Sequence, residues 1–389
     1  MTSTENSKYS YLLMLGHLSS DINQGALLAC MPFLVLHAGF SYTDVAILVF
    51  ASNVISAIVQ PVFGRLGDVR SCPWVMSLGI FLAGLGMAGV GLLHSYPLIV
   101  ASAMVSGIGV AMFHPEGGRL ANLCAGKQKG NGMSIFAVGG NLGFMIGPAM
   151  TAAALSAWGM AGTAVFLIHS TLCALLLLRF GAKFRSFGLR DAASVKLAGR
   201  DRWDLFGAVM AVLSFRSVLF NTLLTFVPLL LVSAFGQTEA FGSLVITLYS
   251  IFGAVATFFS GRISARTGAQ RLLLVCMVGL TCILVGFVLC DSLVVTCLLV
   301  GCSAVLLNAL YPSTVALAQG FVPGHLGTAS GLTYGVAVAV GGMLSPVMGS
   351  IGDAYGLTCV FMVAAGFALV GSILALVLRL ITGNTHMGR

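Results

Sequence analysis

Ionisable side chains inside long apolar runs are the residues of this chain best placed to do chemistry. Asp21 lies one helical turn after His17, and Glu116 closely follows His114, in stretches that otherwise carry almost no charge. A charged group at the centre of a bilayer costs about 2.5–3.5 kcal/mol on insertion scales, so it usually faces a polar cavity and has a function. Carboxyl and imidazole groups in that setting can take up and release protons. We therefore predict that protons are carried by Asp21, Glu116, His114 and His17.

A cation and several neutral polar residues form a second group. Arg216 interrupts a later apolar run, and a guanidinium binds carboxylate or phosphate groups through paired N–H donors. Amide and phenol side chains at comparable depth could line the same pathway. The predicted substrate-binding residues are Arg216, Gln24, Asn221, Asn308 and Tyr311.

Structural roles remain open for the same residues. Asp21 could pair with Arg216 in an ion bridge, and Glu116 could pair with Arg119 on the next helical turn. The two histidines could serve as plain hydrogen-bonding groups. Neither a Cys-x-x-Cys nor a His-Glu-x-x-His spacing occurs in the sequence, so we expect no metal site.

Long apolar runs are the elements that must position these residues. The chain has 389 residues, 58% of them hydrophobic and 8% charged, whereas soluble domains carry about 25% charged residues. Roughly 20 apolar residues span a bilayer, and their backbone polar groups must be paired within a helix. The sequence predicts an all-α integral membrane protein with twelve transmembrane helices. Their expected ranges are 11–37, 43–65, 73–93, 97–121, 131–157, 159–180, 205–234, 239–262, 271–290, 293–320, 327–350 and 356–380.

The distribution of charge predicts the orientation. With the N-terminus in the cytoplasm, 18 of the 19 Lys and Arg residues fall on the cytoplasmic side, and the other, Arg216, lies within a span. The loops on the opposite side carry the acidic residues Asp44, Glu239, Asp291 and Asp353. This asymmetry is the positive-inside pattern. We expect a multi-pass protein with cytoplasmic N- and C-termini, and the net charge of +8 gives no reason to expect nucleic acid as a partner.

Several residues recur at offsets of 196 to 198 positions, which predicts an internal repeat. The matching pairs are Gly64 with Gly261, Pro115 with Pro312, Pro148 with Pro346, and Pro32 with Pro228. Such repeats in transporters are related by an axis along the membrane normal. We predict two pseudo-symmetric six-helix bundles, residues 1–180 and 205–389, joined by a cytoplasmic linker over 181–204.

Two motifs resemble the major facilitator superfamily. The segment Gly64-Arg65-Leu66-Gly67-Asp68-Val69-Arg70 keeps the Gly and Asp of its loop signature but lacks a basic residue directly after the Asp. Gly143 and Gly147, followed by Pro148, resemble a motif of its antiporter branch. The resemblance implies a major facilitator fold and conformational roles for Gly64, Asp68, Arg70, Gly143, Gly147 and Pro148. Asp68 is expected to act as a latch at a helix end.

Three further blocks are similar to the fosmidomycin-resistance exporters. They are Gly16 to Gln24, Phe113 to Glu116 together with Arg119, and Ser134 to Asn141. One departure is Ala103, which stands where drug antiporters of the superfamily usually have an Arg. In that superfamily the first, fourth, seventh and tenth spans line the central cavity. These are the spans that carry polar interruptions here.

The resemblance and the buried charges together imply a proton-coupled secondary active transporter of the bacterial inner (plasma) membrane. We predict an exporter, a drug/proton antiporter that moves a small drug-like compound able to carry a negative charge, by alternating access. The expected partners are this substrate, protons and the lipid bilayer, with the chain acting as a monomer. The motif from Gly143 to Pro148 favours export, and the alternative is a proton symporter that imports an anionic nutrient.

The sequence gives little support to ATP use or to catalysis. No Gly-x-x-x-x-Gly-Lys-Ser/Thr run occurs, so we expect a proton gradient to supply the energy and no cofactor to be needed. His114 and Glu116 could in principle serve a membrane enzyme. They lack a metal-binding spacing, and we expect the protein not to be an enzyme.

Overall fold

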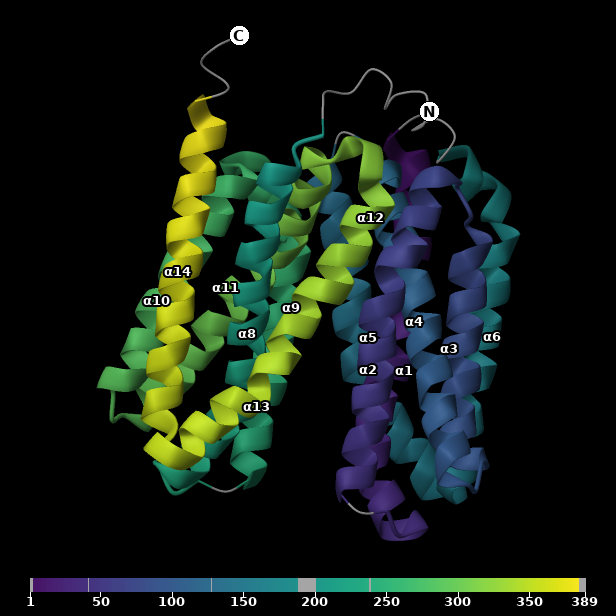
Figure 1. Ribbon diagram of the computed structural model, residues 1–389, viewed down its shortest axis with the longest axis horizontal. Coiled ribbons are helices and arrows are strands. Elements are labelled where there is room, and N and C mark those ends of the chain that lie inside the picture. Colours follow the sequence, from purple (N-terminus) through teal and green to yellow (C-terminus); the bar gives the residue numbers. More distant parts are fainter. Residues whose placement is uncertain (1–2, 41, 127, 188–200, 238, 385–389) are drawn as a thin grey trace. The chain divides into compact units, whose positions relative to one another are not determined.

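The chain folds into long helices (Figure 1). The computed structural model describes residues 3–40, 42–126, 128–187, 201–237 and 239–384. The helices of the first half are α1 (Ser3–Ala38), α2 (Tyr42–Val69), α3 (Trp74–Leu92), α4 (Tyr96–Cys124), α5 (Lys129–Trp158), η1 (Gly159–Thr163) and α6 (Ala164–Arg179). Those of the second half are α8 (Trp203–Ser233), α9 (Glu239–Thr267), α10 (Ala269–Leu289), α11 (Leu293–Phe321), η2 (Pro323–His325), α12 (Leu326–Gly331), η3 (Leu332–Val336), α13 (Ala337–Tyr355) and α14 (Leu357–Asn384).

The predicted all-α membrane fold is confirmed. Ten of the described helical stretches are long and apolar enough to cross a membrane, and one of them, Lys129–Arg179, runs through both α5 and α6. Helix α1 is not among the ten, in keeping with the polar residues that cluster in its middle. With α1 added, and α5 and α6 taken separately, the described helices fill the twelve predicted positions.

The eleventh span is a continuous helical stretch that contains a π-helical turn. The sequence predicts one helix over 327–350, whereas the structure has α12, then a π-helical turn η3, then α13. A π-turn is a local widening of a helix that often occurs at functional sites. Hydropathy cannot reveal it, because hydropathy does not distinguish a π-turn from an α-helical turn.

Contacts between the helices divide the chain into two compact units. One comprises 1–200 together with 323–336, and the other 201–322 together with 337–389. The boundary near residue 200 falls within the predicted linker 181–204, of which residues 188–200 lie outside the described part of the chain. The segment 323–336, from the second half of the sequence, packs with the first unit.

Helices α1 and α5 pack closely because glycines line the contact. A Cβ at Gly143 would lie 2.7 Å from Asp21 Cβ, and one at Gly147 would lie 2.6 Å from the Ile22 carbonyl oxygen. Gly139 likewise lies against the backbone of Met14. Small residues repeated every four positions allow this close approach between membrane helices. The contact fixes the side of α1 that carries Asp21 against α5.

The outer surface of the helices is apolar. Ile58, Leu172, Leu298 and Leu380 are each about 60% exposed, and many other large hydrophobic side chains are exposed with them. Such extended apolar exposure is unfavourable in water and suits lipid contact. The structure is that of a multi-pass membrane protein.

Candidate functional site

Helices α1 and α4 bring three of the four predicted proton carriers together. The Nε2 atom of His17 lies 3.3 Å from Asp21 Oδ2, and the Nε2 atom of His114 lies 3.2 Å from Asp21 Oδ1. All three residues are buried in the first unit, with no more than 6% of any of them exposed. We refer to His17, Asp21 and His114 as the carboxylate–imidazole triad. It holds one acidic group between two basic ones.

The other ring nitrogen of each histidine faces a main-chain carbonyl. His17 Nδ1 lies 2.7 Å from the Phe136 oxygen, and His114 Nδ1 lies 2.9 Å from the Val110 oxygen. A carbonyl oxygen only accepts hydrogen bonds, so both Nδ1 atoms carry a hydrogen. Each Nε2 then either carries a second proton as part of an imidazolium or accepts one from the Asp21 carboxyl. The geometry therefore requires at least one proton between the Asp21 carboxylate and an imidazole. A second proton could lie between the carboxylate and the other imidazole.

The surroundings of the triad are aromatic and small. The His17 ring stacks on Phe136, with ring centroids 4.1 Å apart. A Cβ at Gly140 would lie 2.7 Å from Asp21 Oδ2 and 2.8 Å from His17 Nε2. Gly140 therefore provides the space that the triad occupies. The sequence analysis gave this glycine no role of its own, although it adjoins the glycine stripe of α5.

The fourth proton candidate, Glu116, is placed apart from the triad. Arg119 donates two hydrogen bonds to its carboxylate, of 2.8 and 2.9 Å, and a third of 3.0 Å to Ser71 Oγ. The local pair considered as the structural alternative is thus present. A proton-carrying role for Glu116 stays a prediction.

Asp68 binds the start of α12. Its carboxylate accepts hydrogen bonds from the backbone N–H groups of Gly327 (2.6 Å) and Thr328 (2.8 Å), and from the Thr328 hydroxyl. The N-terminal N–H groups of a helix have no partners within the helix and attract negative charge. Gly64 lies directly against the backbone of Gly327, so α2 and the start of α12 meet without side chains between them.

The remaining residues of the conformational motif have simpler surroundings. Arg70 is exposed just beyond the end of α2. Pro148 lies inside α5, where a Cβ at Gly25 would come within 3.3 Å of its ring.

In the second unit, Arg216 is a buried cation between two aromatic rings. Its guanidinium carbon lies 4.6 Å from the Phe220 ring centroid and 4.5 Å from that of Tyr311. Its Nε donates a hydrogen bond of 3.2 Å to the Leu307 carbonyl. Within the described part of the chain it forms no ion pair with a carboxylate. Its terminal N–H groups can therefore bind an anion.

The other predicted substrate residues are divided between the units. Asn308 is buried and donates a hydrogen bond to the Ala304 carbonyl (2.8 Å), and Asn221 donates one to the Ser217 carbonyl (2.9 Å). Both belong to the second unit with Arg216 and Tyr311, whereas Gln24 is half-buried in the first. Asp21 and Arg216, considered as an ion bridge, also belong to different units, and each has partners within its own unit.

Tyr249 lies next to the predicted substrate residue Asn308, although no role for it was predicted from the sequence. Its side chain on α9 is buried beside Asn308, and its ring centroid lies 6.2 Å from that of Phe220. A phenol in the middle of an apolar span was the available signal. This signal is weak, because α9 carries no charge at its centre.

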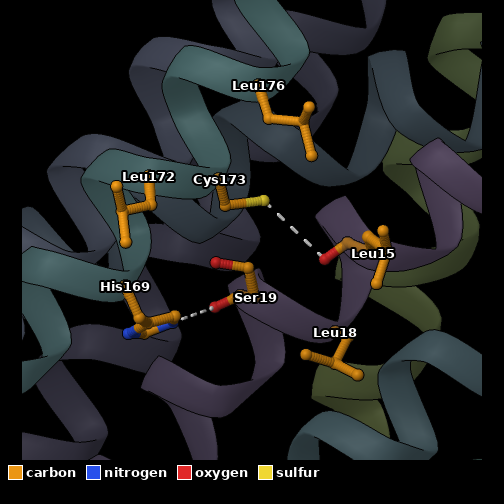
Figure 2. Close-up of a pocket in the computed structure, with 7 residues that line it drawn as sticks. All are labelled: Leu15, Leu18, Ser19, His169, Leu172, Cys173 and Leu176. Atoms are coloured by element: carbon orange, nitrogen blue, oxygen red, sulfur yellow. Dashed lines mark hydrogen bonds between the residues drawn. The ribbon is translucent and has the colours of Figure 1, made fainter.

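A pocket of about 250 Å³ lies between α1 and α6 (Figure 2). Asn23 links the two helices through hydrogen bonds to the Ser19 carbonyl and to Ser170 Oγ. The His169 ring also reaches Ser19, with Nε2 3.4 Å from its carbonyl oxygen. None of the predicted site residues lines this pocket.

Metal binding is chemically possible at the triad. Among the described residues, His17, Asp21 and His114 offer three ligand atoms within 4.8 Å of one another. The absence of a metal site, expected from sequence, stays a prediction.

Long apolar helices in two bundles, each with ionisable side chains buried in its interior, define a membrane transport protein. The chain belongs to the Major Facilitator Superfamily, whose family model matches residues 13–346 and 205–386. The resemblance seen in the sequence is therefore confirmed. The members of this family are transporters rather than enzymes.

Two relatives cover nearly the whole chain. The uncharacterized MFS-type transporter YfnC of Bacillus subtilis (strain 168) is 30% identical over 95% of this chain and 93% of its own length. The fosmidomycin resistance protein of Escherichia coli (strain K12) is 25% identical over 92% of this chain and 90% of its own length.

Solved structures show the same fold at low identity. The human organic anion transporter MFSD10 (TETRAN) has a TM-score of 0.77 at 16% identity and covers 95% of this chain and 99% of its own. FucP in its outward conformation has a TM-score of 0.76 at 13% identity and covers 96% of this chain and 98% of its own.

Proposed function

We propose that the protein is a proton-coupled secondary active transporter that exports a small drug-like compound, able to carry a negative charge, in exchange for protons. The observation that carries this proposal is the triad. Asp21 lies between two imidazoles whose Nδ1 atoms both face main-chain carbonyls. These contacts direct both Nε2 atoms at one carboxylate, which suits the uptake and release of a shared proton.

The energy of one proton is sufficient for this task. One elementary charge that crosses about 100 mV releases ~2.3 kcal/mol. Each ~1.4 kcal/mol corresponds to a tenfold concentration ratio. A single exchanged proton at that potential therefore sustains roughly a fortyfold substrate gradient. We accordingly propose that no cofactor takes part.

Arg216 supports an anionic substrate. Its guanidinium lies against the rings of Phe220 and Tyr311, and its Nε donates a hydrogen bond to the Leu307 carbonyl, which leaves the terminal N–H groups for a ligand. The names of two similar proteins agree with this chemistry, since one is a fosmidomycin resistance protein and another an organic anion transporter. The name of the fosmidomycin resistance protein also supports export and a role in antibiotic resistance.

Asp68 supports alternating access. Its carboxylate binds the N–H groups at the start of α12, a contact between residues 259 positions apart in the sequence. Such a contact can be made in one state of the transport cycle and broken in another. We place the protein in the inner membrane of a bacterium, as a monomer with both termini in the cytoplasm.

The proton assignment is tested by substitution in proteoliposomes. Asp21→Asn keeps the size of the side chain but cannot ionise, and we expect it to abolish substrate-dependent proton release, with His114→Gln reducing it strongly. His169→Gln is the matched control, because His169 lies in the first unit but outside the triad. Glu116→Gln is included to test the remaining candidate. Proton release that persists in both Asp21→Asn and Glu116→Gln would refute the assignment.

The alternative is a proton symporter that imports an anionic nutrient. The same fold serves a transporter described as a fucose:proton symporter, which has a TM-score of 0.75 at 13% identity. Both alternatives use the triad and Arg216. They differ in the direction of proton flux when substrate is added to one side of sealed vesicles, and that measurement separates them.

A further inference from the structure

Tyr334 lies against the two imidazoles of the triad. It lies in the π-helical turn η3, and its ring centroid is 5.7 Å from that of His114 and 6.1 Å from that of His17. The same ring is 6.0 Å from Phe136, the residue on which His17 stacks. Tyr334 is itself only 9% exposed. Two imidazoles and a tyrosine ring thus form one buried cluster in the first unit.

The segment that carries Tyr334 packs on α2 and α4 through glycines. A Cβ at Gly331 would lie 2.6 Å from the Gln60 carbonyl oxygen, and one at Gly335 would lie 3.1 Å from the Gln60 side chain. On α4, a Cβ at Gly118 would lie 3.0 Å from the Tyr334 ring. This close packing leaves little space for water between the segment and the triad.

Asp68 holds the other end of the same segment. Its hydrogen bonds to Gly327 and Thr328 anchor the start of α12, and the six residues of α12 lead directly into η3. The first unit ends at Val336, immediately after the π-turn. A π-turn has hydrogen bonds that can shift by one residue, so it is a suitable place for the helix to yield.

We propose that Tyr334 is the residue that closes the triad to water, and that the Asp68 contact with α12 keeps it in place. When the hydrogen bonds between the Asp68 carboxylate and α12 break, residues 326–336 move away from α2 and α4. The tyrosine ring then leaves the two imidazoles, and the triad becomes accessible to protons from the cytoplasmic side. This inference rests on the proposed function, because it assigns to the triad the proton that is exchanged.

The proposal joins two features that are separate in the sequence. The conformational contact at Asp68 and the proton site at Asp21 are linked by one short segment, so a proton can enter only when the contact is open. Such gating prevents a proton leak through the closed state. This gating requires a discrete element with two positions, and we assign that role to residues 326–336.

The accessibility of the two imidazoles tests the proposal directly. Diethyl pyrocarbonate modifies accessible imidazole rings, and mass spectrometry of the detergent-purified full chain measures the labelling rate at each histidine. We expect Tyr334→Ala to raise labelling of His114 and His17 by about threefold to tenfold, since an aromatic contact is lost. Tyr334→Phe keeps the ring and should label as the wild type does. His169, in the pocket between α1 and α6, is the internal control and should not change.

Asp68 variants test the second half of the proposal. Asp68→Ala removes the acceptor of three hydrogen bonds and should raise labelling of the same two histidines by about tenfold or more. Thr328→Ala removes one donor and should give a smaller increase. If Tyr334→Ala unfolds the chain, Gly118→Ala replaces it, because its Cβ displaces the ring by a small distance.

Unchanged labelling of His114 and His17 in both Tyr334→Ala and Gly118→Ala, in protein that remains folded, would overturn the role of Tyr334. Unchanged labelling in Asp68→Ala would overturn its link to the latch. Failure of the proposed function looks different. In that case labelling responds as expected, yet Asp21→Asn leaves substrate-dependent proton release intact.

Discussion

Gly140 provides the space that the proposed proton site occupies. Its absent Cβ would lie 2.7 Å from Asp21 Oδ2 and 2.8 Å from His17 Nε2, so Gly140→Ala must displace one of these groups. Overpacking of this kind costs about 1–3 kcal/mol, and we expect substrate-dependent proton release to fall by about 5- to 100-fold. Gly366→Ala is the matched control, a helical glycine with nothing within 4 Å of its would-be Cβ. Normal proton release in Gly140→Ala proteoliposomes would contradict the site geometry.

At the same scale, we expect Arg216 to determine which substrates are bound. We expect Arg216→Ala to weaken the binding of anionic compounds by about 10- to 100-fold. The binding of neutral analogues should be almost unchanged, because only a charged ligand uses the terminal N–H groups. Arg216→Lys should restore only part of the affinity, since an ammonium lacks the planar fork. Binding to the purified protein gives the measurement. Arg262→Ala is the control, as Arg262 also lies over two aromatic rings but is exposed. An equal loss for neutral and anionic compounds would exclude the proposed role.

The residue scale also shows how far the sequence could lead. The pairing of His17 with Asp21 was predictable, because four positions in a helix place two side chains on one face. The second imidazole was not, since His114 lies 93 positions away and only the packing of α1 on α4 brings it near. Tyr249 and Tyr334 were missed because uncharged aromatic residues are common in apolar spans.

At the scale of helices, hydropathy is a strong guide, and the predicted bounds mostly agree with the observed ones within a few residues. α1 differs, since it begins at Ser3 rather than near residue 11. The eleventh span differs in containing the π-helical turn η3 within a continuous helical stretch. Neither difference changes the apolar length of a span, which is the only quantity that hydropathy measures. The π-turn is defined by backbone hydrogen bonding, and it carries Tyr334, whose ring lies against the two imidazoles.

The contact between α1 and α5 is testable at this scale. A Cβ at Gly147 would lie 2.6 Å from the Ile22 carbonyl oxygen. No atom of the triad is among the nearest neighbours of that Cβ, so the substitution tests packing alone. Gly147→Ala should lower the free energy of unfolding by about 1–3 kcal/mol and lower the melting temperature in detergent. Gly366→Ala should leave it unchanged or raise it slightly, since Ala favours a helix and no atom obstructs it. A melting temperature for Gly147→Ala at or above that of the wild type would show that the stripe is not a packing contact.

At the scale of the whole molecule, the sequence predicted two related halves, and the contacts give two units with one exchange between them. The segment 323–336 comes from the second half of the chain but packs with the first unit. Offsets between glycines and prolines could not predict this, because a repeat describes each half by itself. Because this segment packs with the first unit, the backbone N–H groups of Gly327 and Thr328 donate hydrogen bonds to Asp68.

Orientation is the remaining property of the whole chain, and reporter fusions test it. Nearly all Lys and Arg residues lie on one side of the spans, and the positive-inside pattern places that side in the cytoplasm. We expect green fluorescent protein fused to the C-terminus to fluoresce, as it does only when it stays in the cytoplasm. Alkaline phosphatase should be active when fused after Leu93, between α3 and α4, and inactive when fused after Gly268, between α9 and α10. The reverse pattern would place the contact between Asp68 and α12, together with Tyr334, on the outer face. Protons would then reach the triad from the outside when that contact opens, which would contradict entry from the cytoplasm.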